Sequence, residues 1–179
     1  MKLSFVEGAS PDKWLRVWRE RHPGIPLEAV QVSERDQLIA LDAGAVDVAI
    51  VRGEDGAEAR AALTEERFAV ELYRERTVVV LPRDHPYADA SELSIADIAE
   101  FERTPAQGTV TDTLAITAAG VGVCVLPMSV ARIHHRKDLV PIPLSDGPEW
   151  PVYLTWRNDS ELIQDFVGIT RGRGARSSR

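Results

Sequence analysis

The sequence predicts an α/β protein built from two similar, Rossmann-like lobes. Short apolar runs alternate with helix-like segments along the first fifty residues, as in a sheet covered by helices. At residues 118–127 a predicted helix ends in Ala-Gly and an apolar strand follows directly. The same pattern, which we call the Ala-Gly phrase, occurs at residues 41–51. Two copies in two halves indicate two lobes. A ligand is expected in the space between such lobes.

The first segments predict a strand, a helix and a second strand. Residues 3–7 form the first strand. Ser10 is predicted as an N-cap with Pro11 at the first helical position, because a serine side chain accepts a free amide and proline needs none there. The helix ends at residues 22–24, His-Pro-Gly, and residues 25–32 alternate partly, as a strand does.

A second helix and a third strand complete the first sheet. Ser33 is predicted to cap a helix that continues to Gly44, with Asp36 at the third position of a capping box. Residues 46–51 are almost wholly apolar, which is typical of a strand buried on both faces. Strands and helices that alternate with short connections predict a parallel sheet.

The middle of the chain is predicted to cross from one lobe to the other. Residues 53–62 are expected to form a loop with some helical character, and residues 68–72 and 77–81 to form two strands. The pattern Leu-Ser-Ile-Ala-Asp-Ile at residues 93–98 combines a capping box with a hydrophobic staple, so it predicts a helix start.

The second Ala-Gly phrase follows another capping box. Residues 109–112, Thr-Val-Thr-Asp, predict a helix that Gly120 closes in a left-handed conformation. Gly122 is expected where two backbone segments approach closely. The remaining predicted elements are a strand at 123–126, a short helix with Val130 and Ile133, strands at 139–144 and 152–156, and a last amphipathic helix with Leu162, Ile163, Phe166 and Val167.

These elements divide into two lobes and a tail. Residues 1–73 and 145–170 are assigned to the first lobe, and residues 74–144 to the second. Residues 171–179 contain four arginines and no acid, so a disordered basic tail is predicted there.

Composition limits the classes of function. The chain has 179 residues, of which 44% are hydrophobic, so it can bury a core. Its net charge of −7 argues against a large DNA-binding surface, which needs clustered Lys and Arg. The single cysteine fits a reducing compartment, and neither a signal peptide nor a membrane-spanning run is visible. A cytoplasmic location is expected.

The residues with reactive side chains do not form a catalytic pattern. His134 and His135 are adjacent, so on a helix they point in different directions, and no carboxylate or thiol follows at the spacing of a metal site. Cys124 lies inside an apolar strand, where a thiol is a core residue and no nucleophile. Nucleophile elbows, phosphate-binding loops and zinc motifs are absent from the sequence. We therefore expect no enzyme activity, no metal and no cofactor.

Trp14 and Trp18 have two interpretations. At helical spacing they are most simply buried in the core. The alternative is a partner-binding surface, because exposed aromatic residues one turn apart make good anchors.

Hydroxyl side chains at several helix starts predict an anion site. Ser10, Ser33, and Thr109 or Thr111 stand at these starts, which gather at the carboxyl ends of the strands in an α/β sheet. Free amides and hydroxyls there attract an anion. For each residue taken singly, an ordinary N-cap is the simpler interpretation.

The order of several motifs resembles the effector-binding (substrate-binding) domain of LysR-type transcriptional regulators. The resemblance covers nearly the whole chain, and in particular it is similar to stand-alone actinobacterial forms, which share residues 128–138 and the arginine-rich ending. The motifs are Arg21-His22-Pro23-Gly24-Ile25-Pro26-Leu27, Leu41-x-Ala43-Gly44-x-Val46-Asp47-Val48-Ala49-Ile50, Val79-x-Leu81-Pro82-x-x-His85-Pro86 and Ala119-Gly120-Val121-Gly122-x-x-x-Leu126-Pro127.

The resemblance implies a fold like that of type II periplasmic binding proteins, with the effector between two lobes. Ser10, followed by Pro11, matches the family's hydroxyl at the first helix, and Ser33 matches the contact at the second. The family's winged helix-turn-helix does not precede the first strand, so direct specific DNA binding by this chain is not expected. The stretch from Phe101 to Thr109 is shorter than in the family, which leaves open a reduced second lobe.

We expect this chain to bind a small organic anion through Ser10, Ser33, Thr109 and Thr111, to take part in transcriptional regulation and to form a homodimer, as the resemblance implies. The alternative is a protein–protein module that pairs with itself or with a full-length LysR-type regulator.

Overall fold

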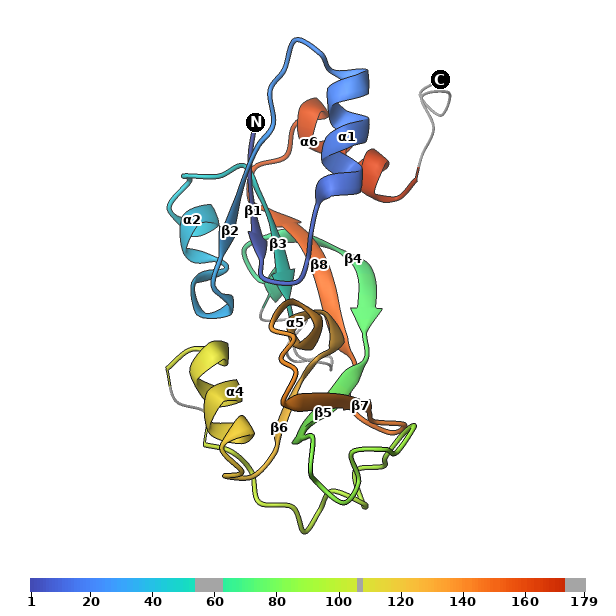
Figure 1. Cartoon of the computed structure of the whole chain (residues 1–179). Coiled ribbons are helices and arrows are strands. Elements are labelled where there is room, and N and C mark those ends of the chain that lie inside the picture. The colour runs from blue at the N-terminus through green and yellow to red at the C-terminus, as the bar shows by residue number, and fades with distance from the viewer. Residues whose placement is uncertain (54–62, 106–107, 173–179) are drawn as a thin grey trace. The chain divides into compact units, whose positions relative to one another are not determined.

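The computed structural model describes residues 1–53, 63–105 and 108–172 (Figure 1). The chain divides into two compact units, which we describe separately. Unit 1 comprises Met1–Arg74 and Pro151–Arg179, and unit 2 comprises Glu75–Trp150. The loop predicted at 53–62 and the predicted basic tail lie almost wholly outside the described residues. No helix in the described ranges has the length and apolar character needed to span a bilayer.

Unit 1 contains a five-stranded sheet in the order β2-β1-β3-β8-β4. As the sequence predicts, β2 and β3 both pair parallel to β1, with Leu3 opposite Ala29 and Val48. β8 then pairs antiparallel to β3. The elements are β1 (Lys2–Val6), α1 (Asp12–Arg21), β2 (Glu28–Val32), a 3-10 turn η1 (Glu34–Asp36), α2 (Ile39–Asp42), β3 (Val48–Arg52), β4 (Phe68–Glu75), β8 (Trp150–Trp156) and α6 (Glu161–Thr170).

Helices cover both faces of this sheet. One face packs under α1 and α6, which lie side by side (Figure 1), and its core includes Trp14, Trp18 and Phe166. The other face packs against α2 through Leu41 and Tyr153. Both tryptophans of α1 are buried within unit 1, so the core interpretation is confirmed and the partner-surface interpretation is wrong.

Unit 2 contains a three-stranded sheet in the order β6-β5-β7, in which both outer strands run antiparallel to β5. Its elements are β5 (Thr77–Pro82), α4 (Val110–Ala118), β6 (Cys124–Pro127), α5 (Met128–Ile133) and β7 (Leu139–Pro143). The side chains of β5 alternate between two apolar clusters. Val78 and Val80 pack with Leu114 of α4, whereas Val79 and Leu81 pack in the cluster of Leu93.

Residues 145–150, assigned to the first lobe from the sequence, lie in unit 2. The hydroxyl of Thr77 connects them to β5: it donates to the carbonyl oxygen of Pro148 and accepts the indole N–H of Trp150 at 2.9 Å.

The two predicted glycine conformations are confirmed. Gly120 has φ +82° and ends α4. Gly122 has φ +93°, and a Cβ at this position would lie 2.6 Å from the carbonyl oxygen of Glu102. Glycine is needed there because the neighbouring atom belongs to backbone, which has no room to move aside.

The helix predicted from residues 93–98 does not form. The capping box itself is present, because Ser94 Oγ accepts the amide of Asp97 at 3.2 Å and donates to its carboxylate at 2.7 Å. The following amides donate three residues back instead of four, as from Phe101 to Ile98. Arg103 then forms a parallel β-bridge with Val123, whose amide donates to the carbonyl oxygen of Glu102 at 2.8 Å, so the chain returns to extended backbone after a few turns.

Two helix starts in unit 1 also differ from the prediction. The single helix predicted after Ser33 is divided into η1 and the short α2. The N-cap of α1 is Pro11, which has no side-chain cap hydrogen bond, and Ser10 lies one residue earlier. Ser10 Oγ accepts only a long hydrogen bond, 3.4 Å, from the amide of Asp12. The prediction of Ser10 as the N-cap is therefore wrong.

Candidate functional site

The loops that follow β1, β2 and β3 meet at one end of the unit 1 sheet, at the carboxyl ends of these three strands, because the strands are parallel. Ser10 lies in the loop after β1, and Ser33 directly after β2. Both hydroxyls therefore lie at the same end of the sheet, as the sequence predicts. Both side chains are exposed there.

Arg52 contacts two of these loops, and the sequence analysis did not single it out as a site residue. The residue ends β3, and its side chain is wholly buried. One guanidinium nitrogen lies 3.0 Å from the carboxylate of Glu34, and another donates to the carbonyl oxygen of Glu7 at 2.9 Å. The signal in the sequence was a cation at the end of an otherwise apolar strand. Buried cations need such partners, so Arg52 fixes the shape of this end of the sheet.

Ser33 is the N-cap of η1, as predicted for a helix start. Its hydroxyl accepts the amide of Asp36 at 3.2 Å and donates to the Asp36 carboxylate at 2.7 Å. The neighbouring Gln37 exchanges two hydrogen bonds with the backbone of Arg52, at 2.8 and 2.9 Å. The contacts of Gln37, which directly follows η1, hold the end of η1 against the end of β3.

In unit 2, Thr109 forms the predicted capping box at the start of α4. Its hydroxyl donates to the carboxylate of Asp112 at 2.8 Å and accepts the Asp112 amide at 3.2 Å. The backbone amide of Thr109 and then its hydroxyl lower the pKa of Asp112 below the ordinary value of 3.8. Thr111 lies in the first turn, and its hydroxyl is 3.4 Å from Nδ1 of His134.

Three of the hydroxyls predicted for the anion site share one arrangement. Ser10, Ser33 and Thr109 each donate to an aspartate carboxylate of their own helix start, and the Ser10 contact to Asp12 is 2.7 Å long. A carboxylate therefore already occupies the position where an anionic ligand would accept the hydroxyl. An incoming anion has to displace that carboxylate and overcome its charge.

Unit 2 has a cavity of about 350 Å³ beside the start of α4. Thr109 lines it together with apolar residues of β6 such as Val125 and Leu126, and Arg103 supplies a cation. Arg103 is exposed. Sequence reasoning missed it because nothing local distinguishes it from other surface arginines.

Cys124 also lines this cavity, and burial raises the pKa of its thiol, with a smaller opposite effect from Thr117. A protonated, buried thiol is a poor nucleophile. His134 and His135 do not belong to a metal cluster: the described ranges contain no group of three or more His, Cys, Asp or Glu side chains that could hold an ion.

Solved structures with this fold include several effector-binding domains. The BenM effector binding domain with its effector benzoate aligns with a TM-score of 0.73 at 19% identity, over 96% of this chain and 90% of that one. Oxidized OxyR of Corynebacterium glutamicum aligns with a TM-score of 0.73 at 20% identity, over 97% and 63%. Full-length CbnR complexed with its target DNA aligns with a TM-score of 0.70 at 17% identity, over 97% and 70%.

A curated relative is an uncharacterized HTH-type transcriptional regulator, YnfL, of Escherichia coli K12. It is 22% identical over 183 residues, which cover 85% of this chain but only 59% of that regulator. Residues 12–103, slightly more than half of the chain, match the family model described as the LysR substrate binding domain. The match includes Ser33, begins after Ser10 and Pro11, and ends before Thr109 and Thr111. The chain therefore belongs to the LysR substrate-binding domain family.

Proposed function

We propose that this chain senses a small organic anion as the effector domain of a LysR-type transcriptional regulator, and that it does no chemistry on the bound molecule. The family match over residues 12–103 carries this proposal. It is supported by the hydroxyls of Ser10 and Ser33 at one end of the unit 1 sheet, and by Thr109 and Arg103, which line the cavity of unit 2. Thr111, also proposed as a contact, does not line that cavity, and its hydroxyl lies 3.4 Å from Nδ1 of His134. Benzoate, the effector named for BenM, is an anion of this kind.

The geometry adds a specific requirement to the proposal. The effector's carboxylate has to take the Ser10 hydroxyl from Asp12, or the Thr109 hydroxyl from Asp112. Removing either hydroxyl should then weaken binding, and neutralising either aspartate should strengthen it, because the repulsion between two negative groups disappears.

A thermal-shift screen of small carboxylates and of sulfur- or nitrogen-containing metabolites, followed by calorimetric titration, tests this proposal. Ser10→Ala should weaken binding about ten-fold, as expected for one hydrogen bond to a charged group. Asp12→Asn should tighten it. Ser94→Ala is the matched control, since Ser94 makes the same contacts with Asp97 in a turn outside the proposed site. Equal affinities for all these variants would contradict the role of Ser10.

We also propose that the chain pairs with a second copy of itself or with a full-length LysR-type regulator. β2 is an edge strand whose residues are largely exposed, and Val30 within it is 52% exposed. Such an edge offers unpaired backbone groups to another chain. Sedimentation should give a concentration-dependent mass, and Val30→Lys should shift it toward the monomer; a monomer at every concentration would contradict this.

The net charge of −7 supports a further part of the proposal: these 179 residues do not bind duplex DNA specifically on their own. A sequence-specific footprint at physiological salt would contradict it.

A further inference from the structure

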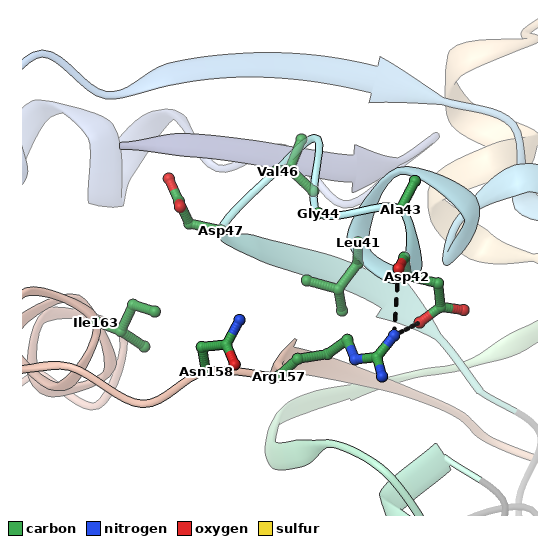
Figure 2. Close-up of a pocket in the computed structure, with 9 residues that line it drawn as sticks. All are labelled: Leu41, Asp42, Ala43, Gly44, Val46, Asp47, Arg157, Asn158 and Ile163. Atoms are coloured by element: carbon green, nitrogen blue, oxygen red, sulfur yellow. Dashed lines mark hydrogen bonds and ion pairs between the residues drawn. The ribbon is translucent and has the colours of Figure 1, made fainter.

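Unit 1 has a cavity of about 330 Å³ at the opposite end of its parallel strands from Ser10 and Ser33. It lies where β3 begins and β8 ends, which are neighbours because these strands are antiparallel. Its apolar lining comes from three buried residues, Leu41, Val46 and Ile163. Polar groups from separate segments also reach it: Asp47 precedes β3, and Arg157 and Asn158 follow β8 (Figure 2).

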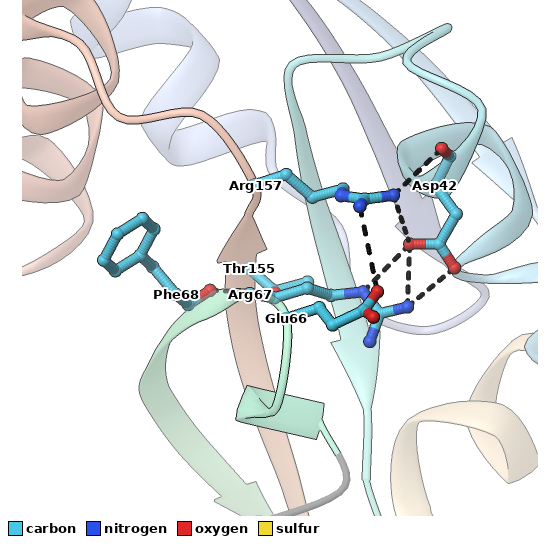
Figure 3. A network of polar contacts seen from close by, with 6 residues as sticks. All are labelled: Asp42, Glu66, Arg67, Phe68, Thr155 and Arg157. Atoms are coloured by element: carbon cyan, nitrogen blue, oxygen red, sulfur yellow. Dashed lines mark hydrogen bonds and ion pairs between the residues drawn. The ribbon is translucent and has the colours of Figure 1, made fainter.

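The carboxylate of Asp42, beside this cavity, is already neutralised. Arg67 binds it through two nitrogens, with contacts of 2.7, 2.7 and 3.0 Å (Figure 3). A charge-assisted fork of this geometry is strong and directional. Asp42 therefore anchors Arg67 and is not the group that would bind a ligand.

Arg157 is held much more loosely than Arg67. It donates to the carbonyl oxygen of Asp42 at 3.2 Å, but its distances to the carboxylates of Asp42 and Glu66 are 3.9 and 3.7 Å (Figure 3). Close ion pairs are about 2.7–2.9 Å long. The side chain is 38% exposed, so its guanidinium can accept a closer carboxylate from solution.

Asp47 supplies the opposite charge. One of its oxygens accepts the backbone amide of Lys2 at 2.7 Å, which fixes the carboxylate in place. Within the described ranges no cation pairs with it, and the side-chain amide of Asn158 has no hydrogen-bond partner there. The cavity thus presents a fixed carboxylate, a loosely held guanidinium, an amide that both donates and accepts, and an apolar lining.

We propose that this cavity binds a free α-amino acid in its zwitterionic form. The ammonium group binds Asp47 and the amide oxygen of Asn158. The carboxylate binds Arg157 and the amide nitrogen of Asn158, and an aliphatic side chain packs on Leu41, Val46 and Ile163. A volume of about 330 Å³ lies in the range of small-ligand pockets. The site is separate from the proposed effector site and does not depend on it.

Calorimetric titration of the full chain with three related probes tests both charges at once. L-leucine carries both groups, 3-methylbutylamine lacks the carboxylate, and 4-methylpentanoate lacks the ammonium. Leucine should bind saturably, and each single-charge analogue should bind at least about ten-fold more weakly. Binding of 4-methylpentanoate alone would overturn the proposal, as would the absence of saturable binding by any standard amino acid.

Variants locate the binding. Asp47→Asn and Asn158→Ala should each weaken leucine binding about ten-fold, and Arg157→Gln at least as much. Arg157→Lys keeps the charge but loses the fork, so it should fall between Arg157→Gln and the unchanged chain. Arg136→Gln is the matched control, because Arg136 is an ion-paired surface arginine of unit 2.

Two further measurements distinguish a loss of leucine binding at this cavity from a loss of folding and from binding at another site. Asn158→Ala removes a side chain that makes no hydrogen bond within the described residues, so its thermal unfolding should match that of the unchanged chain. Ser10→Ala and Thr109→Ala should leave leucine binding unchanged. If they weaken it while the Asp47 and Asn158 variants do not, leucine binds elsewhere and the proposal is wrong.

Discussion

The two units contain the same local phrase but build different sheets from it. In unit 1 the helix that ends near Gly44 leads into β3, which pairs parallel to β1. In unit 2 the helix that ends near Gly120 leads into β6, which pairs antiparallel to β5. Both glycines have positive φ, 68° and 82°. The phrase thus sets the local path of the chain, whereas the pairing partner depends on residues far away in the sequence.

The units also differ in how their sheets are covered. Helices pack on both faces in unit 1, where Trp18 and Phe166 fill one core. In unit 2, α4 and α5 cover one face, and the turns of residues 93–101 cover the other. The largest fully buried side chains of unit 1 are Trp18 and Phe166, whereas those of unit 2 are leucine and isoleucine, so the contribution of burial to the free energy of unfolding should differ between the units.

The largest expected effect compares one core residue from each unit. Trp18 is 0% exposed, donates its indole N–H to the carbonyl of Ile25 at 2.8 Å and meets Phe166 edge-on at 5.7 Å. Trp18→Ala should lower the free energy of unfolding by about 3–5 kcal/mol. Leu81→Ala, in the helix-free core of unit 2, should cost about 2–5 kcal/mol. Urea unfolding followed by circular dichroism measures both.

Ile39→Ala is the control for these core variants, because Ile39 is 62% exposed and its loss should change stability by less than about 0.5 kcal/mol. A Trp18→Ala value no larger than the control would show that the core of unit 1 is not the dominant source of its stability.

Glycine substitutions distinguish the cost of a positive φ from the cost of a steric clash in the two Ala-Gly phrases. Gly44→Ala and Gly120→Ala each place a side chain at positive φ with no atom within 4 Å, so each should cost about 1–2 kcal/mol. Gly122→Ala adds a clash with the Glu102 carbonyl and should cost clearly more than either. Thermal unfolding of the three variants gives the order, and equal losses would contradict the close approach at Gly122.

The sequence predicted most of the secondary structure, because apolar runs and glycines act on the few residues around them. Apolar runs located the strands, and Gly120 and Gly122 adopt the conformations expected of them. The helix predicted from residues 93–98 does not form for a physical reason. A capping box satisfies the first amides, but it does not extend a helix when Arg103 must form a β-bridge with Val123.

The candidate site was predictable only in part. Ser33 and Thr109 cap as expected, because a cap depends on residues within one turn. Arg52 acquires its role from Glu7 and Glu34, which belong to two other loops. The cavity at Asp47 and Arg157 joins residues more than one hundred positions apart, so no spacing rule could have indicated it.

A smaller effect compares the helix starts of the two units. Thr109→Ala removes a complete capping box and should lower the free energy of unfolding by about 1 kcal/mol. Ser10→Ala removes no cap from α1 and should cost no more than about 0.5 kcal/mol. Chemical unfolding of both variants, without ligand, tests the comparison. A Ser10→Ala loss equal to that of Thr109→Ala would restore Ser10 as a true cap.

The smallest effect is the pH dependence of the α4 cap. The amide and then the hydroxyl of Thr109 lower the pKa of Asp112 below 3.8. Because the folded pKa is depressed, the cap stabilises fully above the ordinary value, and this stabilisation is lost as the pH falls through the folded pKa. Thr109→Ala keeps the amide but removes the hydroxyl, so the pKa of Asp112 should rise part of the way toward 3.8.

Carboxyl chemical shifts followed by NMR from neutral to acid pH measure this change. Asp97 is the internal control, since Ser94 lowers its pKa in the same manner and the substitution does not touch it. If Asp112 titrates at the same pH in both proteins, its hydrogen bond from the Thr109 hydroxyl does not persist in solution, and the hydroxyl would then be free to meet an effector.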